Sequence, residues 1–564
     1  MRLAAIALVC ASCVPARPPP TLTTFAEASG YKRTGRYDEV LALCRDFARA
    51  YASVTCETIG ETLQGRPLVA LRVAKHANLP YIYVEGGIHA GEIDGKDAGF
   101  AFLRDLLDGK VAKGALDHVS LIFVPVLNPD GHEQFGPNHR PNQRGPEELG
   151  FRTNGARLNL NRDWVKTDAP EIRAALGVFR RYDPLILVDL HTTDGAKFEH
   201  DISLTMSPYA PRADSLDETT AKLSSTLVAR LAELGHLPVD FYPSFVDDER
   251  PESGFGKGEA PPRFSQAYMA TRGRIGILVE THSWRRYHER VESSYHALQA
   301  LFEAAVRTAD SWVKSAHEAD AADAKVAGTD VPMMWKTTGE SHDIDFRGYA
   351  YERRLSEITG GTWLVYDESR PEVWRVPLYD SVEPAVTIKA PAHGYIVDGG
   401  FARNVAAILD RHGIAYSVAT PATAVEVFRA DSVTFAPPYE GRTRATITGA
   451  WTTEKRTLDA GAIFVPIAQA KSRLIIHLFE PSLPDSLAQW GVFNAVFEHK
   501  EYAEPYVLEQ AVRDMFAASP ALADEFSEFA NRTPAPSTDA RLEWIHRHHP
   551  SWDERVNLLP VYRR

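Results

Sequence analysis

The sequence predicts an α/β fold: a mixed, largely buried sheet flanked by helices, followed by a C-terminal α/β or α+β region. Two observations predict this class. Short runs of Val, Ile and Leu alternate along the chain with stretches whose apolar residues have helical spacing. Several of these runs lack the alternating polar residues of a strand with one wet face, so the central strands are expected to be buried on both faces.

The predicted elements follow one another in a regular order up to residue 315. An amphipathic helix over 38–52 comes first. Strand-like runs occupy 54–60, 68–74, 81–88, 119–128, 185–191 and 275–282. Helical patterns occupy 94–108, 170–181, 215–235 and 290–315.

The chain is too long, at 564 residues, for one ordinary domain. A charged Ala- and Asp-rich stretch over 316–328 predicts a boundary. We therefore expect one domain over 36–320 and an accessory region over 329–564 that ends in helices. Within the accessory region, residues 394–419 predict a βαβ-like unit without a phosphate-binding glycine fingerprint. Further strands are predicted over 441–480 and polar helices over 485–531.

The first residues resemble an export signal. One Arg precedes a short apolar stretch and small residues, so residues 1–16 are expected to be a signal peptide and 17–35 a Pro- and Thr-rich linker. The alternative is lipoprotein processing, with a lipid anchor on Cys13. We expect a secreted, periplasmic or cell-envelope protein. Export would permit a disulfide between Cys44 and Cys56, and two buried free thiols are the alternative.

Charge and hydropathy exclude two classes of protein. The net charge is −13, and a nucleic-acid-binding protein needs a basic face, so we expect no nucleic-acid partner. No run of about 18 apolar residues exists, so we expect no transmembrane helix in the mature chain.

The first chemical signal is a His-x-x-Glu pair, His89 and Glu92, in a Gly-rich turn that follows a predicted strand. Such a turn can direct an imidazole and a carboxylate at one metal ion, and zinc accepts both ligands. The pair His477 and Glu480 has the same spacing. It falls in a predicted strand, where positions three apart point to opposite faces and cannot share a metal.

Two further strands end in residues suited to a zinc hydrolase. His191 closes one apolar run and is the candidate third ligand, because ligands gather at the carboxyl ends of strands in an open α/β sheet. Glu280 closes another, and a carboxylate there needs either a task, as general base, or a partner. The alternative for Glu280 is a structural salt bridge with Arg285 or Arg286. The alternative for the third metal ligand is His282, two residues after Glu280.

A polar loop over 151–164 carries Arg152, Asn161 and Arg162. Guanidinium groups bind carboxylates through paired hydrogen bonds, and an Asn amide adds a donor. Such a group could hold a free carboxylate and polarise a carbonyl. The alternative is a solvated basic loop.

In order along the chain, these residues resemble the zinc carboxypeptidases of the A/B and N/E type. The matching positions are His89, Glu92, the NPDG sequence at 128–131, Arg152, Asn161, Arg162, His191 and Glu280. The resemblance covers about residues 30–320. It implies a carboxypeptidase-like sheet and a catalytic domain over 36–320 that hydrolyses peptides bearing a free C-terminal carboxylate.

The resemblance also implies a role for each residue. His89, Glu92 and His191 would bind one Zn²⁺ per chain. Arg152 would polarise the scissile carbonyl and stabilise the oxyanion, and Glu280 would be the general base. Asn161 and Arg162 would grip the C-terminal carboxylate of the substrate.

Three positions depart from the family pattern. Asn159 stands where the family usually has an Asp that orients the first zinc His, although its carbonyl oxygen can still accept a hydrogen bond. Gly258 stands where a substrate-binding Tyr is usual, with Tyr242 and Tyr268 as weak substitutes, and Thr193 stands where digestive members have Tyr. Two rival functions follow. One is a zinc amidohydrolase acting on cell-wall peptides with D-amino acids or on N-acyl amino acids, and the other is a catalytically degenerate binding protein.

Overall fold

The computed structural model describes residues 22–212, 214–420 and 424–564. The predicted signal and Cys13 lie outside these residues. The first helices and strands follow the predicted order closely: α1 (Phe25–Ala28), α2 (Tyr37–Ala50), β1 (Val54–Glu61), β2 (Pro67–Val73), β3 (Tyr81–Gly86), α3 (Asp94–Leu107), β4 (Ser120–Val124), α4 (Pro129–Glu133), α5 (Pro170–Tyr182), β5 (Ile186–Thr193), β6 (Ile202–Ser207), α6 (Ser215–Glu233), β7 (Pro238–Val239), β8 (Phe255–Gly256), α7 (Ser265–Thr271), β9 (Ile275–His282) and α8 (Tyr287–Asp323).

Eight strands form one mixed sheet in the order β1-β2-β4-β3-β5-β9-β6-β7. The four central strands β4, β3, β5 and β9 are parallel to one another. The pairs β1–β2, β2–β4 and β6–β9 are antiparallel. The central strands are buried along their length, as their continuous apolar sequences predict. The predicted α/β class and the mixed, buried sheet are confirmed.

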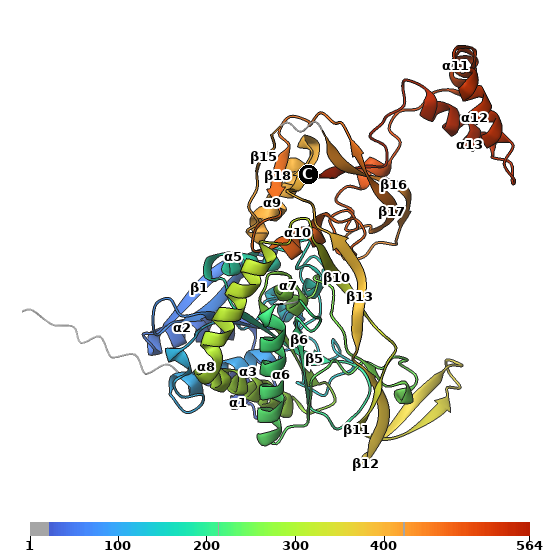
Figure 1. Ribbon diagram of the computed structural model, residues 1–564. Coiled ribbons are helices and arrows are strands. Elements are labelled where there is room, and N and C mark those ends of the chain that lie inside the picture. The colour runs from blue at the N-terminus through green and yellow to red at the C-terminus, as the bar shows by residue number, and fades with distance from the viewer. Residues whose placement is uncertain (1–21, 213, 421–423) are drawn as a thin grey trace, which may run out of the picture.

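Each face of the sheet packs against different elements, because successive side chains of a strand point to opposite sides. On one face, Val84 and the apolar side chains of neighbouring strands that point the same way pack against α2, α3, α6 and α8 (Figure 1). On the other face, Tyr83 and the side chains of neighbouring strands that point the same way pack against α5 and α7. This apolar core continues into the C-terminal region, where it includes Leu409 and Ile475. The C-terminal region therefore shares a core with the sheet.

The segment before the sheet is folded onto it. Residues 22–35, expected to be linker, include α1, whose N-cap Thr24 forms a capping box with Glu27. Glu27 also pairs with Arg104 of α3 at 2.8 Å. Cys44 of α2 and Cys56 of β1 form a disulfide, which decides the question left open by the sequence.

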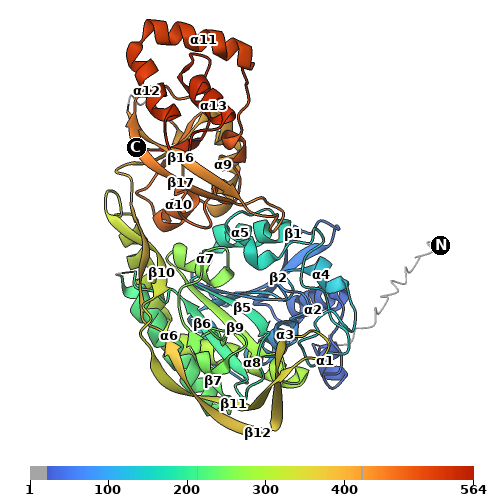
Figure 2. The same ribbon diagram turned by 90° about the vertical axis from the view of Figure 1, so that its right-hand side faces the viewer.

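After α8 the chain builds two β-ribbons. The strands are β10 (Asp330–Thr337), β11 (His342–Leu355), β12 (Thr362–Tyr379) and β13 (Val382–Lys389). The long antiparallel pair β11–β12 projects beyond the eight-stranded sheet (Figures 1 and 2). Its base is fixed to the domain because β8 pairs with β12, and Phe198 and Phe255 pack against Phe346 and Trp374.

The remaining residues form a second sheet and a helical end. The elements are β14 (Gly394–Val397), α9 (Gly399–His412), β15 (Ser417–Val418), β16 (Val425–Phe435), β17 (Ala445–Glu454), β18 (Ile463–Pro466), α10 (Ser472–Phe479), α11 (Pro505–Ala518), α12 (Pro520–Ala530), α13 (Thr538–His548) and β19 (Leu558–Arg563). The sheet order is β15-β18-β14-β19-β16-β17. Figure 2 shows this six-stranded sheet above the eight-stranded sheet, with α11, α12 and α13 farther out.

Two predictions for this region are wrong. The run 473–480, predicted as a strand, is the helix α10, buried between the two domains on nearly all sides. A short apolar run has no polar face, so its periodicity cannot separate a strand from a buried helix. Within the range 485–531 predicted as helical, α11 and α12 begin only at Pro505, and residues 485–504 hold turns and a short 3-10 helix over Asn494–Phe497.

Candidate metal centre and active site

The carboxyl ends of three neighbouring parallel strands carry the predicted zinc ligands and base. The chain leaves β3 at Gly86, passes through a turn that holds His89 and Glu92, and enters α3. His191 lies near the end of β5, directly beside Glu280 of β9 in the register of the sheet. The topology thus brings together residues that are up to 191 positions apart.

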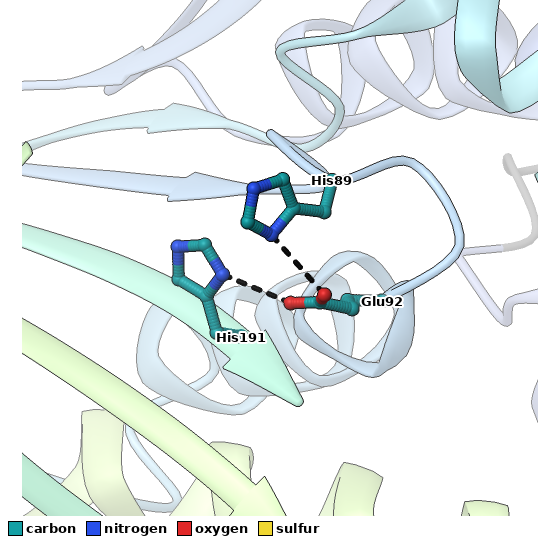
Figure 3. Close-up of side chains that lie close together, drawn as sticks. All are labelled: His89, Glu92 and His191. Carbon is teal, nitrogen blue, oxygen red and sulfur yellow. Dashed lines mark hydrogen bonds and ion pairs between the residues drawn. The ribbon is translucent and has the colours of Figure 1, made fainter. Parts of the chain in front are cut away.

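His89, Glu92 and His191 form one buried cluster (Figure 3). The Nδ1 atoms of His89 and His191 lie 3.1 and 2.9 Å from the two oxygens of the Glu92 carboxylate. One ligand atom from each residue lies within 4.8 Å of the others. Two imidazoles and a carboxylate are ligands that zinc takes in catalytic sites, so the three residues fit one zinc ion.

The outer nitrogen of each imidazole is already bound. The Nε2 atom of His89 lies 2.9 Å from the Asn159 side-chain oxygen, as expected for an Asn that replaces the usual Asp. The Nε2 atom of His191 lies 2.7 Å from the carboxylate of Asp189, which also accepts a hydrogen bond from Ser265 at 2.6 Å. Acceptors at Nε2 fix the rings so that both Nδ1 atoms face the metal position.

The electrostatics of two ligands favour their metal-binding forms. Burial lowers the pKa of His89 to about 4, so its imidazole is neutral at pH 7. Burial alone would raise the pKa of Glu92, but His89 and the Arg140 guanidinium hold it well below its usual value. A neutral imidazole and an ionised carboxylate are the protonation states that bind a metal ion.

Glu280 is buried beside this cluster, with 6% of its surface exposed. Burial raises the pKa of Glu280 to about 8; His191 opposes this shift and Glu92 adds to it. Its Oε2 atom has no hydrogen-bond partner among the described residues. The two arginines considered as salt-bridge partners bind elsewhere: Arg285 donates to the Glu199 carbonyl and Arg286 pairs with Glu289.

His282 does not join the cluster. Its ring stacks on Phe198 with centroids 4.0 Å apart, and it accepts a hydrogen bond from the Phe198 N–H. This contact explains why the last residue of β9 is a packed imidazole and not a ligand.

Two guanidinium groups reach the metal cluster. Arg152 lies 3.2 Å from Oε1 of Glu92, and a third of its side chain is exposed, so it faces the space above the ligands. Arg140, which the sequence did not single out, lies 2.7 Å from the same oxygen and 3.4 Å from Asp194. Arg140 sits in a polar loop after α4, where no pattern distinguishes it from its neighbours.

Asn161 and Arg162 lie next to the cluster but face different ways. The Asn161 side chain is buried: its oxygen accepts the Ser265 N–H at 2.9 Å, and its nitrogen lies 3.4 Å from Nε2 of His191. The Arg162 guanidinium lies over the Phe264 ring at 4.2 Å and donates to the carbonyl of Asn161. Arg162 is therefore the better placed of the two to meet a carboxylate.

The NPDG sequence holds this architecture together. Asn128 caps α4 by accepting the Gly131 N–H. Its side-chain nitrogen donates to the carbonyls of Ile88, which precedes the first ligand, and of Arg152. The segment thus fixes the backbone beside the His89 turn and beside Arg152 at once.

Of the two tyrosines considered, only Tyr242 reaches the site. Its hydroxyl accepts a hydrogen bond from Thr193 at 3.3 Å, and burial together with the carboxylates of Glu280 and Glu92 raises its pKa. Tyr268 lies on the opposite face of the sheet against His412. Asp189 was missed, although it lies two residues before His191 on one strand face, which is the signal that could have found it.

The sheet and the site together define a single-zinc hydrolase of the α/β class. Residues 40–226 match a family model described as "Zinc carboxypeptidase". The chain is 23% identical over 431 residues to "Carboxypeptidase 2" of Trichophyton equinum, with 73% of each chain covered. It is 26% identical over 131 residues to "Carboxypeptidase B" of Astacus astacus, covering 23% of this chain and 43% of that protein.

Among solved structures, a putative carboxypeptidase A from Shewanella denitrificans is similar at 22% identity. The alignment covers 48% of this chain and 69% of that one, with a TM-score of 0.37. Residues 40–226 therefore match the zinc carboxypeptidase family, and the complete ligand set of His89, Glu92 and His191 within them is that of a zinc metallocarboxypeptidase.

Proposed function

We propose that the enzyme removes residues from the C-terminus of peptides, with Glu280 as general base, Arg152 as oxyanion donor and Arg162 as carboxylate anchor. The observation that carries this proposal is the position of Glu280 beside the His89, Glu92 and His191 cluster, with an Oε2 atom that no described residue binds. A zinc ion in such a cluster acts as a Lewis acid and makes a water molecule acidic near pH 7.

The residues divide the hydrolysis of one amide bond between them. Glu280 accepts a proton from the attacking water while the water oxygen bonds to the carbonyl carbon. Arg152 stabilises the negative charge that develops on the carbonyl oxygen. The C–N bond then breaks, and Glu280 returns the proton to the leaving amine, so the base ends the cycle as it began.

The raised pKa of Glu280 suits this task. A group with a pKa near the working pH both accepts and returns a proton readily. A divalent cation beside the carboxylate lowers this pKa, because opposite charge favours the ionised form.

A cavity next to the site supplies room for the rest of the peptide. Its volume is about 510 Å³. It extends from Asp194 and Tyr242 to strand β12 of the β11–β12 ribbon, where Trp363 and Tyr366 line it. Its charged lining residues are Asp194, Asp248 and Glu249. The residues upstream of the scissile bond would occupy this cavity, and acidic residues there would be disfavoured by like charge.

A peptide library with a mass readout tests the proposal. Each peptide is supplied with a free and with an amidated C-terminus, with Lys or Glu upstream of the last residue. We expect release of single C-terminal residues from the free acids, faster with Lys upstream, and a large loss on amidation. Equal cleavage of acids and amides would contradict the anchor, and cleavage confined to D-amino acid or N-acyl substrates would favour the rival amidohydrolase.

Glu280→Gln tests the base in the same assay, with the partly exposed Glu289 in the first turn of α8 changed to Gln as the matched control. We expect Glu280→Gln to lower kcat by about 10²–10⁴ while one zinc per chain remains bound. Near-normal turnover would remove Glu280 from this role. Glu289→Gln should keep both activity and zinc.

We also propose that the enzyme works outside the reducing cytosol. The Cys44–Cys56 disulfide supports this, because disulfides persist in oxidising compartments. The helices of the described residues include none with the length and apolar character to cross a bilayer. Cell fractionation followed by N-terminal sequencing tests export, and a full-length chain found only in the cytosol would contradict it.

A further inference from the structure

A β-turn of the C-terminal region lies against the active-site loop of the catalytic domain. The turn is the tip of the connection between β16 and β17, residues 439–442. Tyr439 and Arg442 exchange two backbone hydrogen bonds, of 2.9 and 3.0 Å. Glu440 and Gly441 between them have positive φ angles of 49° and 75°. Two central residues with positive φ make a type I′ turn, which is a tight and well-defined hairpin tip.

Three residues of this turn contact the segment that carries Asn159. The Glu440 carboxylate accepts the backbone N–H of Asn159 at 2.7 Å. Arg442 forms a two-pronged ion pair with Asp168, with distances of 2.9 and 2.6 Å. Gly441 packs on Leu158 so closely that an added Cβ would lie 3.3 Å from its side chain.

Asn159 in turn fixes the first zinc ligand. Its side-chain oxygen lies 2.9 Å from Nε2 of His89 and accepts the N–H of Asn161 at 3.1 Å. A continuous path of hydrogen bonds therefore runs from Glu440 through Asn159 to His89. The outer partner of a metal-binding histidine sets the orientation of the ring, and fixing the backbone of that partner fixes its side chain.

The turn is also held in place within the C-terminal region. Tyr439 stacks on Trp490 with ring centroids 6.1 Å apart and an angle of 16° between the rings.

We propose that the 439–442 turn is a positioning element of the active site, in which Glu440 acts on His89 through Asn159. The C-terminal region then completes the site of the catalytic domain. The proposal rests on the metal cluster and not on the identity of the substrate.

The affinity for zinc tests the positioning role of Glu440 without any assay of activity. The zinc dissociation constant is measured by competition with a chromogenic chelator for the full-length wild type, Glu440→Ala and Glu440→Gln. We expect Glu440→Ala to bind zinc about 3- to 10-fold more weakly. Glu440→Gln should bind as wild type does, because an amide oxygen can accept the same N–H. Unchanged affinity in Glu440→Ala, or an equal loss in both variants, would overturn the proposal.

Two further variants separate positioning from general damage. Glu454→Ala removes a carboxylate at the far end of the same hairpin, where it pairs with Arg429 and Arg456 inside the C-terminal region, and it should keep wild-type zinc affinity. Glu440→Asp withdraws the carboxylate by one methylene and serves if the Ala variant does not fold. We expect an intermediate loss, and full retention by Glu440→Asp would count against the proposal.

If the wild type cleaves no peptide, the zinc measurements still decide this proposal. Its failure and the failure of the proposed function can therefore be told apart.

Discussion

The carboxylate of Asp189 offers the sharpest test of the metal site. It is fully buried and lies 2.7 Å from Nε2 of His191. Asp189→Asn keeps the shape of the side chain but removes the charge. A hydrogen bond to a charged group contributes about 1.5–3 kcal/mol and a neutral one about 0.5–1.5 kcal/mol, so the change weakens the hold on His191 by about 1–2 kcal/mol.

This loss corresponds to a zinc affinity about 5- to 30-fold lower, since each 1.4 kcal/mol is tenfold. Glu85, the neighbour of Asp189 in the sheet register, does not cancel it. Burial and the charge of Asp189 raise the pKa of Glu85 well above its usual value, which favours its neutral form and limits the repulsion that the variant could relieve.

Chelator competition measures the effect, and Asp183→Asn provides the control. Asp183 precedes the same strand at its other end, where it pairs with Arg274 at 2.7 Å. We expect Asp183→Asn to change stability and leave zinc affinity within twofold of wild type. Equal affinities in both variants would refute the claim that Asp189 orients the ligand.

Two more predictions follow from the arginine anchor and from a buried histidine. Arg162→Ala should lower kcat/KM for free-acid peptides about 10- to 150-fold, from the loss of about 1.5–3 kcal/mol, and leave amidated peptides unaffected; an equal loss on both substrates would argue against the anchor. Burial lowers the pKa of His412 to about 3, against about 6.5 in the unfolded chain, so its contribution to stability is complete above pH 6.5 and is lost as the pH falls toward 3. Between pH 6.5 and 4.5 the wild type should lose about 2 kcal/mol more unfolding free energy than His412→Gln, as measured by urea titration; parallel losses would show that His412 is not neutral in the fold.

The metal ligands could be found from the sequence because their positions follow from local patterns. Apolar runs predict buried strands, and the carboxyl ends of neighbouring parallel strands meet at one edge of the sheet. His89, His191 and Glu280 all lie at such ends, so their convergence needed only the order of the strands. The contact between Asn159 and His89 was also predictable, since the Asn side chain keeps an oxygen that accepts a hydrogen bond from the imidazole.

Other features depend on which distant segments pack together, and no local pattern encodes that. Arg140 reaches Glu92 from a loop without regular structure, and Asn161 turns inward because Ser265, 104 residues away, supplies a backbone donor. The run at α10 is a helix in which nearly every residue is buried, and the short apolar pattern of the run does not encode that choice.

The sequence by itself determined the buried sheet and the metal ligand set, because each depends on the period of a strand or on the chemistry of a residue type. Only the tertiary structure decided that Glu440 binds the backbone of Asn159 across 281 residues. Such a contact arises from the docking of one folded unit on another, and its energy comes from surfaces that exist only after each unit has folded.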